Sequence, residues 1–177
     1  MLNPVLPSMA VAAKLREGLT GSPPPTVVAE LLRPGDILLH LDVPTKERAL
    51  EDISRFVAAR HGLVAEKLYA SLVEREKVGS TGLGQGLAIP HARVPGLSQV
   101  IAAFARTADA IPFDAPDGKP VSDLLVILVS RHATEAHLSL LAAAAEMFCN
   151  AAFRERLRAC ADAAAVHAAF TQWSPRD

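Results

Sequence analysis

The chain has few aromatic residues and few cysteines, and its charges nearly cancel. Aromatic residues make up 5% of its 177 residues although half are hydrophobic, so the core has to be built from alanine, leucine, valine and isoleucine. Eighteen Lys and Arg against nineteen Asp and Glu leave a formal charge of −1. This balance gives no general field for gripping nucleic acid or an anionic membrane, and we expect neither as a partner.

The sequence also lacks the motifs of membrane-spanning, secreted and metal-binding proteins. No apolar run approaches the roughly 20 residues that a membrane-spanning helix needs. The residues before Lys14 carry no basic charge, which disfavours a secretory signal. Cys149 and Cys160 have no CxxC spacing and are expected to be free thiols, which favours a cytoplasmic protein. No HxxxH or carboxylate cluster indicates a metal site, and no cofactor is expected.

The organisation of the chain follows from its glycines, prolines and hydrophobic periodicity. Residues 1–25 end in three consecutive prolines and are predicted to be a flexible appendage; residues 26–172 form one domain, and residues 173–177 a C-terminal tail. The periodicity predicts helices at 26–32, 46–60, 64–77, 134–149, 150–159 and 161–170. It predicts strands at 37–43, 99–106, 111–113 and, as a central buried strand, 124–129. Together these indicate a three-layer α/β domain with helices on both faces of the sheet.

One histidine, His91, stands at the end of a distinctive segment. A polar loop with glycines at 79, 82, 84 and 86 runs into the short apolar strand at 87–89, and Pro90 stops that strand immediately before His91. Glycines let backbone N–H groups approach an anion closely, and Pro90 stiffens the backbone that holds the imidazole. The segment is therefore typical of a phosphoryl acceptor site.

The same segment resembles the active-site signature of the type-2 enzyme IIA family of the phosphoenolpyruvate-dependent phosphotransferase system. Glu76 is followed after six residues by Leu83-Gly84, and after two more by Leu87-Ala88-Ile89-Pro90-His91-Ala92, which matches every position of that signature. The resemblance extends to the approach at 75–82 and to a hairpin at 111–121, and covers about 27–170. It implies a mannitol-type enzyme IIA fold with a mixed β-sheet.

The resemblance also implies the chemistry. His91 would take a phosphoryl group from a small histidine-phosphorylated carrier protein, HPr-like, and hand it on, so that the chain acts as a phosphotransferase component through a phosphohistidine intermediate. A neutral imidazole is a competent nucleophile near physiological pH. His137 occupies the place of the family's second active-site histidine and is predicted to give a supporting hydrogen bond. If Thr134 caps its helix, His137 lies in the first turn, where the helix dipole disfavours imidazolium.

Other groups are candidates for charge stabilisation. Arg75 offers a planar, permanently charged fork that matches phosphate. Ser80, Thr81, Gly82 and Gly84 offer backbone N–H groups and hydroxyls to the phosphoryl oxygens.

Structural alternatives remain for each of these residues. Arg75 also fits a helix C-terminus, which is the role we expect for Lys77, and the glycines also fit simple turns. His137, taken alone, also fits a surface residue. His40, His61, His132 and His167 have no comparable context.

Three functions fit these observations to different degrees. The chain has neither room for an enzyme IIB domain nor a membrane span, and its loop looks like the loop of the nitrogen-regulatory form. We therefore expect a regulatory enzyme IIA whose phosphorylation state controls what it binds. A fructose- or mannitol-type subunit that passes phosphate to a IIB component is the alternative. A binding module without transfer is the third, and a hydrolase is disfavoured because no GxSxG motif is present.

Overall fold

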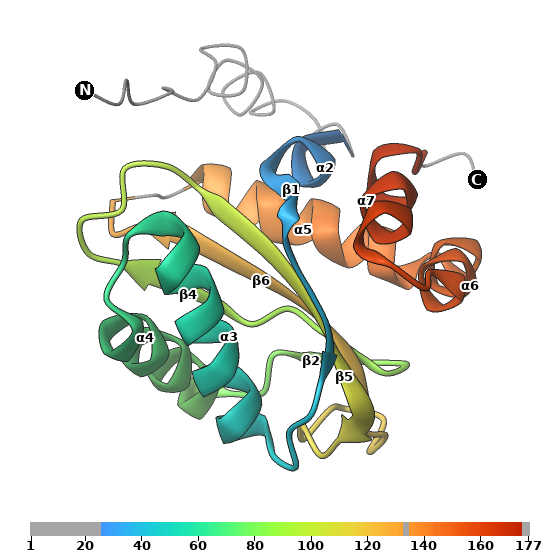
Figure 1. The fold of residues 1–177 in the computed structure, drawn as a ribbon, viewed down its shortest axis with the longest axis horizontal. Coiled ribbons are helices and arrows are strands. Elements are labelled where there is room, and N and C mark those ends of the chain that lie inside the picture. The colour runs from blue at the N-terminus through green and yellow to red at the C-terminus, as the bar shows by residue number, and fades with distance from the viewer. Residues whose placement is uncertain (1–25, 133–134, 175–177) are drawn as a thin grey trace.

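The computed structural model describes residues 26–132 and 135–174, in which most strands follow one another in the middle of the chain, with helices before and after them (Figure 1). The helices are α2 (Thr26–Leu31), α3 (Lys46–His61), α4 (Ala65–Val78), α5 (Glu135–Cys149), α6 (Ala151–Ala159) and α7 (Ala163–Thr171). The strands are β1 (Leu32–Leu41), β2 (Gly82–Gly84), β3 (Leu87–Ala88), β4 (His91–Val94), β5 (Ile101–Ile111) and β6 (Val121–Ser130). None of these helices is long and apolar enough to cross a bilayer.

The strands form a mixed sheet in the order β1-β5-β6-β3-β2, with β4 also paired to β6. β5 runs antiparallel to β6, whereas β3 and β4 run parallel to β6, and β1 parallel to β5. The aliphatic run at 124–129 therefore lies in a central strand, as predicted. Parallel pairing of β4 with β6 places the start of β4 beside Ile127 in the middle of the sheet.

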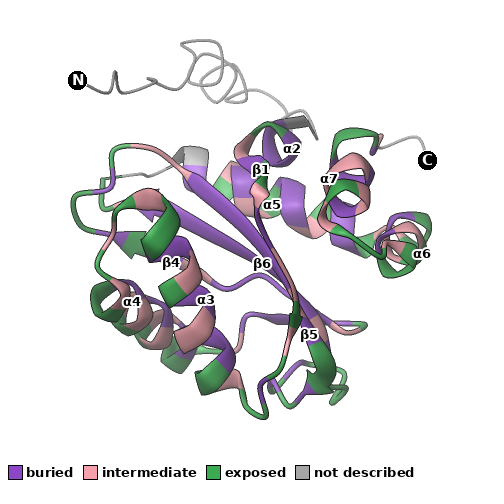
Figure 2. Cartoon of the chain, viewed as in Figure 1, coloured by how far each residue is buried: buried purple, intermediate pink, exposed green. Residues whose placement is uncertain are grey.

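Both faces of the sheet are covered, so the predicted three-layer architecture is confirmed. Along β6, Leu124, Val126 and Leu128 pack into one core with the apolar faces of α3 and α4. Leu125 and Ile127 point the other way, into a second core with α2, α5, α6 and α7. Figure 2 shows the resulting buried β5–β6 layer between exposed helix surfaces.

Two strands differ from their predicted bounds, and in both a proline lies at the point of difference. β1 begins at Leu32 rather than at residue 37, and its register against β5 shifts between Leu32 and Ile37, around Pro34-Gly35. Such an interruption is tolerated because β1 is an edge strand. The predicted strand at 111–113 is wrong: β5 runs on to Ile111, and Pro112, which has no N–H to donate, ends the ladder there.

The chain beside the site forms one strand more than predicted. The short strand expected before Pro90 is present as β3, which ends at Ala88, and a new strand begins at once, because His91 is the first residue of β4 and pairs with Ile127. The carbonyl of Pro90 still accepts a hydrogen bond from the Ile127 N–H at 3.0 Å, so the ladder against β6 resumes at once. The side chains of His91 and Arg93 consequently share one face of β4.

The C-terminal boundary is marked by Trp173. Its side chain is buried and meets the Phe153 ring edge-on, with centroids 6.2 Å apart. The packed chain thus includes one residue beyond the predicted boundary at 172. The predicted appendage at 1–25 and Thr134, the predicted helix cap, lie outside the described residues.

Candidate functional site

The ring of His91 is held by two hydrogen bonds at the start of β4. Its Nδ1 lies 2.8 Å from the carbonyl oxygen of Ile89, which can only accept, so Nδ1 carries the proton. Arg75 Nε donates to Nε2 at 3.0 Å, which requires a lone pair on Nε2. The pattern defines a neutral imidazole with its nucleophilic nitrogen turned to a guanidinium.

The surroundings of His91 keep that imidazole neutral. Burial lowers the pKa of His91 below its ordinary value, and the positive charge of Arg75 acts in the same direction. The Ile89 hydrogen bond and the charge of Glu76 oppose this effect but do not reverse it. The ring is therefore unprotonated, and so nucleophilic, at pH values somewhat below those at which an exposed histidine is.

Arg75 contacts both the end of its helix and the His91 ring. It lies in the last turn of α4, and one terminal nitrogen donates to the Gly79 carbonyl at 3.0 Å while Nε donates to His91. One guanidinium thus caps the helix end and reaches the imidazole. Its fixed fork geometry suits both contacts at once.

His137 lies close to His91 at the start of α5. The ring centroids are 5.6 Å apart with their planes tilted by 51°, and His137 is buried. Its Nδ1 is buried and has no hydrogen-bond partner among the described residues. Burial, followed by the charges of His91, Arg93 and Arg75, lowers the pKa of His137, which agrees with the expectation that it is not a cation.

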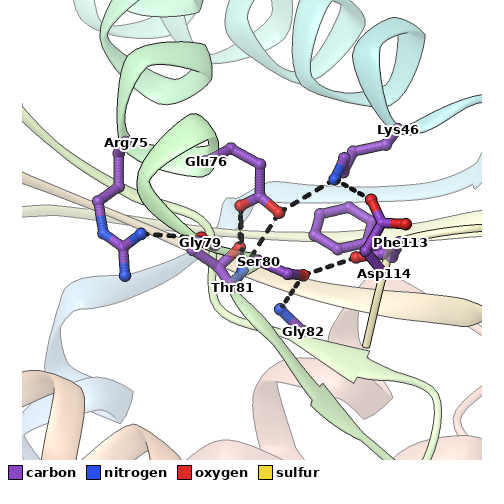
Figure 3. A network of polar contacts seen from close by, with 9 residues as sticks. All are labelled: Lys46, Arg75, Glu76, Gly79, Ser80, Thr81, Gly82, Phe113 and Asp114. Atoms are coloured by element: carbon purple, nitrogen blue, oxygen red, sulfur yellow. Dashed lines mark hydrogen bonds and ion pairs between the residues drawn. The ribbon is translucent and has the colours of Figure 1, made fainter. Parts of the chain in front are cut away.

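Three of the predicted loop residues, Ser80, Thr81 and Gly82, line a cavity at His91, but the hydroxyls of Ser80 and Thr81 are directed to other parts of the chain (Figure 3). The Ser80 hydroxyl donates to the Phe113 carbonyl at 2.6 Å and accepts from the Gly82 N–H at 3.1 Å. Thr81 donates its hydroxyl to Glu76 at 2.6 Å. Their predicted bonds to phosphoryl oxygens therefore stay a prediction, and the contacts seen here hold the loop in place.

Gly84 is constrained by its surroundings rather than by the site. Its φ of +89° is in the left-handed region, and a Cβ there would lie 3.0 Å from the Asp117 carboxylate. Asp117 in turn accepts from the Gln85 N–H at 2.8 Å. A tight turn explains this glycine on its own.

Two cavities meet at His91. One of about 390 Å³ is lined by Arg75, His91, Arg93 and His137, by Ser71 and Glu74, and by apolar residues. The other, of about 220 Å³, is lined by Arg75 and His91 and by the loop at 80–83. The two arginines of the larger cavity outnumber its one carboxylate, so the cavity suits an anionic group carried by a larger molecule.

Two features of the site were absent from the sequence-based prediction. Arg93 was missed because a strand that ends before His91 gives no reason to place residue 93 on the same face; the two-residue period of β4 is the signal that places it there. Lys46, which pairs with Glu76 at 3.4 Å, was missed because nothing near it in the sequence points to residue 76.

The pH dependence of the two rings follows from their shifts. Both His91 and His137 are expected to titrate in NMR with midpoints below about 6.5, the ordinary histidine value. Just below that pH the unfolded chain then binds more protons than the folded chain. The contribution of these rings to the free energy of unfolding should therefore fall as the pH drops below about 6.5 and stay constant above it. The same titration in urea supplies the unfolded reference. Midpoints at or above the unfolded values would contradict the geometry.

Comparison with known proteins gives the same assignment as the site. A family model described as phosphoenolpyruvate-dependent sugar phosphotransferase system, EIIA 2, matches residues 30–173. The nitrogen regulatory protein of Pseudomonas aeruginosa is 42% identical over 139 residues, which are 78% of this chain and 90% of that protein. The fructose-specific EIIA component of Haloferax volcanii is 40% identical over 124 residues, 68% of this chain and 80% of that protein.

A solved structure agrees with these relatives. The crystal structure of the nitrogen regulatory protein IIA-Ntr from Neisseria meningitidis matches with a TM-score of 0.77 at 40% identity, over 82% of this chain and 99% of that one. The family match at residues 30–173 includes the strand that carries His91. The chain therefore belongs to the type-2 EIIA family of the phosphoenolpyruvate-dependent sugar phosphotransferase system.

Proposed function

We propose that the chain is a nitrogen-regulatory enzyme IIA that accepts a phosphoryl group on His91 from a histidine-phosphorylated, HPr-like carrier protein. The observation that carries the proposal is the His91 ring, with its proton fixed on Nδ1 by the Ile89 carbonyl and its Nε2 lone pair beside Arg75. The names of the relatives from Pseudomonas aeruginosa and Neisseria meningitidis support the regulatory assignment.

The transfer follows from this geometry. Nε2 of His91 attacks the phosphorus of the donor phosphohistidine, a new N–P bond forms, and the donor nitrogen leaves with the electron pair of the broken bond. The proton stays on Nδ1, where the Ile89 carbonyl stabilises the positive charge that the ring acquires. Because the Nε2 lone pair is now bonded to phosphorus, Arg75 Nε turns to the phosphoryl oxygens. Phosphoryl transfer depends mainly on positioning the reacting groups and on stabilising the charge of these oxygens. His137, with its unpartnered Nδ1, supplies the supporting hydrogen bond, and the loop at 80–84 closes the site.

The direct test is phosphoryl transfer to the intact chain. Incubation with a carrier phosphorylated by phosphoenolpyruvate should give one acid-labile phosphoryl group, and ³¹P NMR should assign it to Nε2 of a histidine that peptide mapping identifies as His91. A chain that takes no label, or takes it on a hydroxyl, would overturn the proposal and favour a binding module on the same fold.

The rim of the site suits protein docking. Val78 and Leu138 line the larger cavity although they are 83% and 67% exposed, and Leu83, which lines the smaller one, is 41% exposed. Exposed apolar side chains gathered around a cavity are typical of an interaction surface. We assign the carrier protein to this rim.

Leu138→Asp should therefore weaken productive encounter with the carrier. We expect kcat/KM for phosphoryl acceptance to fall about tenfold, the effect of losing about 1.4 kcal/mol at an interface side chain. Val64→Asp is the matched control, because Val64 is 52% exposed, precedes α4 as its N-cap and lines neither cavity. Both substitutions place a carboxylate near a helix N-terminus, where it is tolerated. Equal rates for the two variants would contradict the assignment of the carrier protein to this rim.

Phosphorylation is proposed to control partner binding through charge. A phosphoryl group on His91 adds about −1.5 to −2 charges to a cavity lined by Arg75 and Arg93, and it removes the acceptor that Arg75 uses in the free protein. Calorimetric titration of candidate regulatory proteins with the phosphorylated chain, the unphosphorylated chain and His91→Asp should give different affinities. Equal affinities for all three forms would refute the control.

A second function is favoured by one relative. The 40% identity to a fructose-specific EIIA component supports a subunit that passes its phosphoryl group to a sugar-specific IIB component. The phosphorylated chain, mixed with isolated fructose- and mannitol-type IIB domains, separates the two. Rapid and complete transfer to a IIB domain would favour the sugar-transport function, whereas a phosphoryl group that stays on His91 favours the regulatory one.

A further inference from the structure

Lys46 is a partly buried cation that lies next to the site without touching His91. It is the first residue of α3, and its side chain is 15% exposed. Its Nζ contacts Glu76 Oε1 at 3.4 Å and Asp114 Oδ2 at 2.7 Å, and it lies 5.4 Å from the centre of the Phe113 ring (Figure 3). Three segments distant in the sequence thus meet at one ammonium group.

The carboxylate of Glu76 is the centre of this cluster. Its side chain is 6% exposed, and it accepts three contacts from Thr81: the N–H at 3.1 and 3.2 Å to its two oxygens, and the hydroxyl at 2.6 Å. A buried carboxylate is tolerated only when it is hydrogen-bonded and paired with a cation. Lys46 is the only cation that contacts Glu76 among the described residues.

From Thr81 the hydrogen bonds continue to the reacting ring. The Thr81 carbonyl accepts from the Ile89 N–H at 3.0 Å, and the Ile89 carbonyl accepts the Nδ1 proton of His91 at 2.8 Å. A chain of hydrogen bonds therefore runs from Lys46 through Glu76, Thr81 and Ile89 to the imidazole. It ends on the atom that decides which ring nitrogen carries the proton.

The same carboxylate also anchors the other support of the ring. Glu76 directly follows Arg75 in the last turn of α4, so the bonds from Glu76 to Thr81 fix the helix end from which Arg75 reaches Nε2. The Gly79 carbonyl, between these residues, accepts from Arg75 at 3.0 Å. Both hydrogen bonds of the His91 ring thus depend on one buried carboxylate.

We propose that Lys46 and Glu76 are positioning residues, whose ion pair holds His91 in the tautomer with Nε2 free and holds Arg75 against Nε2. This inference rests on the proposed function, since it concerns the same phosphoryl acceptor. Without the ammonium group the Glu76 carboxylate turns toward water, the loop at 79–81 loosens, and the Ile89 carbonyl no longer selects the Nδ1–H tautomer. Asp114 lies closer to Lys46, at 2.7 Å, but its side chain is 81% exposed, so solvent screens this ion pair and we assign the positioning role to Glu76.

Lys46→Met is the test, because it keeps the length of the side chain and removes the charge. We expect the single-turnover rate of phosphoryl acceptance to fall about 10- to 100-fold, the scale of a small misplacement of a reacting group. Lys46→Arg should restore much of the rate. The matched controls are Asp114→Asn and Arg48→Met; the latter removes a cation of α3 that pairs with Glu51 and Asp52, and both should keep the wild-type rate within about twofold.

A second measurement detects positioning without any transfer. ¹⁵N NMR of the unphosphorylated ring should show Nδ1 protonated and Nε2 unprotonated in the wild type and a mixture of the two tautomers in Lys46→Met. A wild-type chain that takes no phosphoryl group would refute the proposed function but leave this measurement valid. Unchanged tautomers together with an unchanged rate in Lys46→Met would refute the positioning role. If Lys46→Met does not fold, Glu76→Gln, which keeps an acceptor for Thr81 but loses the charge, takes its place under the same criteria.

Discussion

Replacement of His91 by alanine is expected to abolish acid-labile phosphorylation, with a loss of more than about 10³-fold in the rate of acceptance. The reason is that Nε2 of His91 carries the lone pair that accepts the hydrogen bond from Arg75. The centre of the His137 ring lies 5.6 Å from the centre of the His91 ring, and His137 accepts no hydrogen bond from Arg75 in the structure. The measurement is ³²P incorporation from a phosphorylated carrier, followed by release in acid.

The control for this variant is another histidine outside the site. His167→Ala on α7 removes an imidazole that lines neither cavity, and it should take label as the wild type does. Persistent label on His91→Ala would map the acceptor elsewhere. Label on His137 in that variant would reassign the two rings, whereas label on Ser80 or Thr81 would point to a different chemistry.

Periodicity and capping residues predicted most of the fold because these elements obey local rules. The helix at 46–60 is found within one residue, since Thr45 caps its start and Gly62, with φ +66°, ends it. The aliphatic run at 124–129 was placed in the sheet centre because residues buried on both faces have no polar alternation. Prediction failed at Pro34-Gly35, where β1 continues with a shift in register, and at Pro112, where β5 has ended, because a local pattern does not show how a strand pairs with its neighbours. It also missed β4, which begins directly after Pro90 because the chain pairs with β6 there.

Most members of the candidate site were predictable, but its bonds were not. The resemblance of residues 76–92 to the family signature implied His91 as the acceptor, and the structure places Arg75 and His137 beside His91. The hydrogen bond from His91 Nδ1 to the Ile89 carbonyl was not predictable, because it depends on a backbone turn that directs this carbonyl at the ring two residues later. Lys46 reaches Glu76 only through the packing of α3 on α4, which no local pattern encodes.

The hydrogen-bond partners of the glycine-rich loop differ from those that the sequence predicted. Its donors were expected to face an anion, but the Thr81 hydroxyl donates to Glu76 and the Ser80 hydroxyl donates to the Phe113 carbonyl. A loop whose hydroxyls are already hydrogen-bonded within the chain is a rigid support for its neighbours. Under the proposed function, Arg75 and Arg93 are then the cations that would meet the phosphoryl oxygens in the cavity of about 390 Å³.

Arg75→Ala is expected to slow phosphoryl acceptance about 10²- to 10³-fold, which is the usual effect of removing one preorganised donor from a transition state. The variant should keep its fold, because alanine is a good residue for the last turn of α4 and the side chain lost is only partly buried and lies outside both hydrophobic cores. It should also raise the pKa of His91, since the charge of Arg75 lowers it in the native protein. Stopped-flow transfer and an NMR titration of the ring measure the two effects.

Two further variants separate the guanidinium from its charge. Arg75→Lys keeps the charge but lacks the fork that serves Gly79 and His91 together, so it should keep the lowered pKa and recover only part of the rate. Lys77→Ala removes the other cation of the same helix turn and should change the rate less than about twofold. If Lys77→Ala slowed transfer as much as Arg75→Ala, the effect would belong to the helix end. A normal rate in Arg75→Ala would leave the hydrogen bond to Nε2 without a part in the transfer, and the charge of the phosphoryl group would then have to be met by Arg93 on β4.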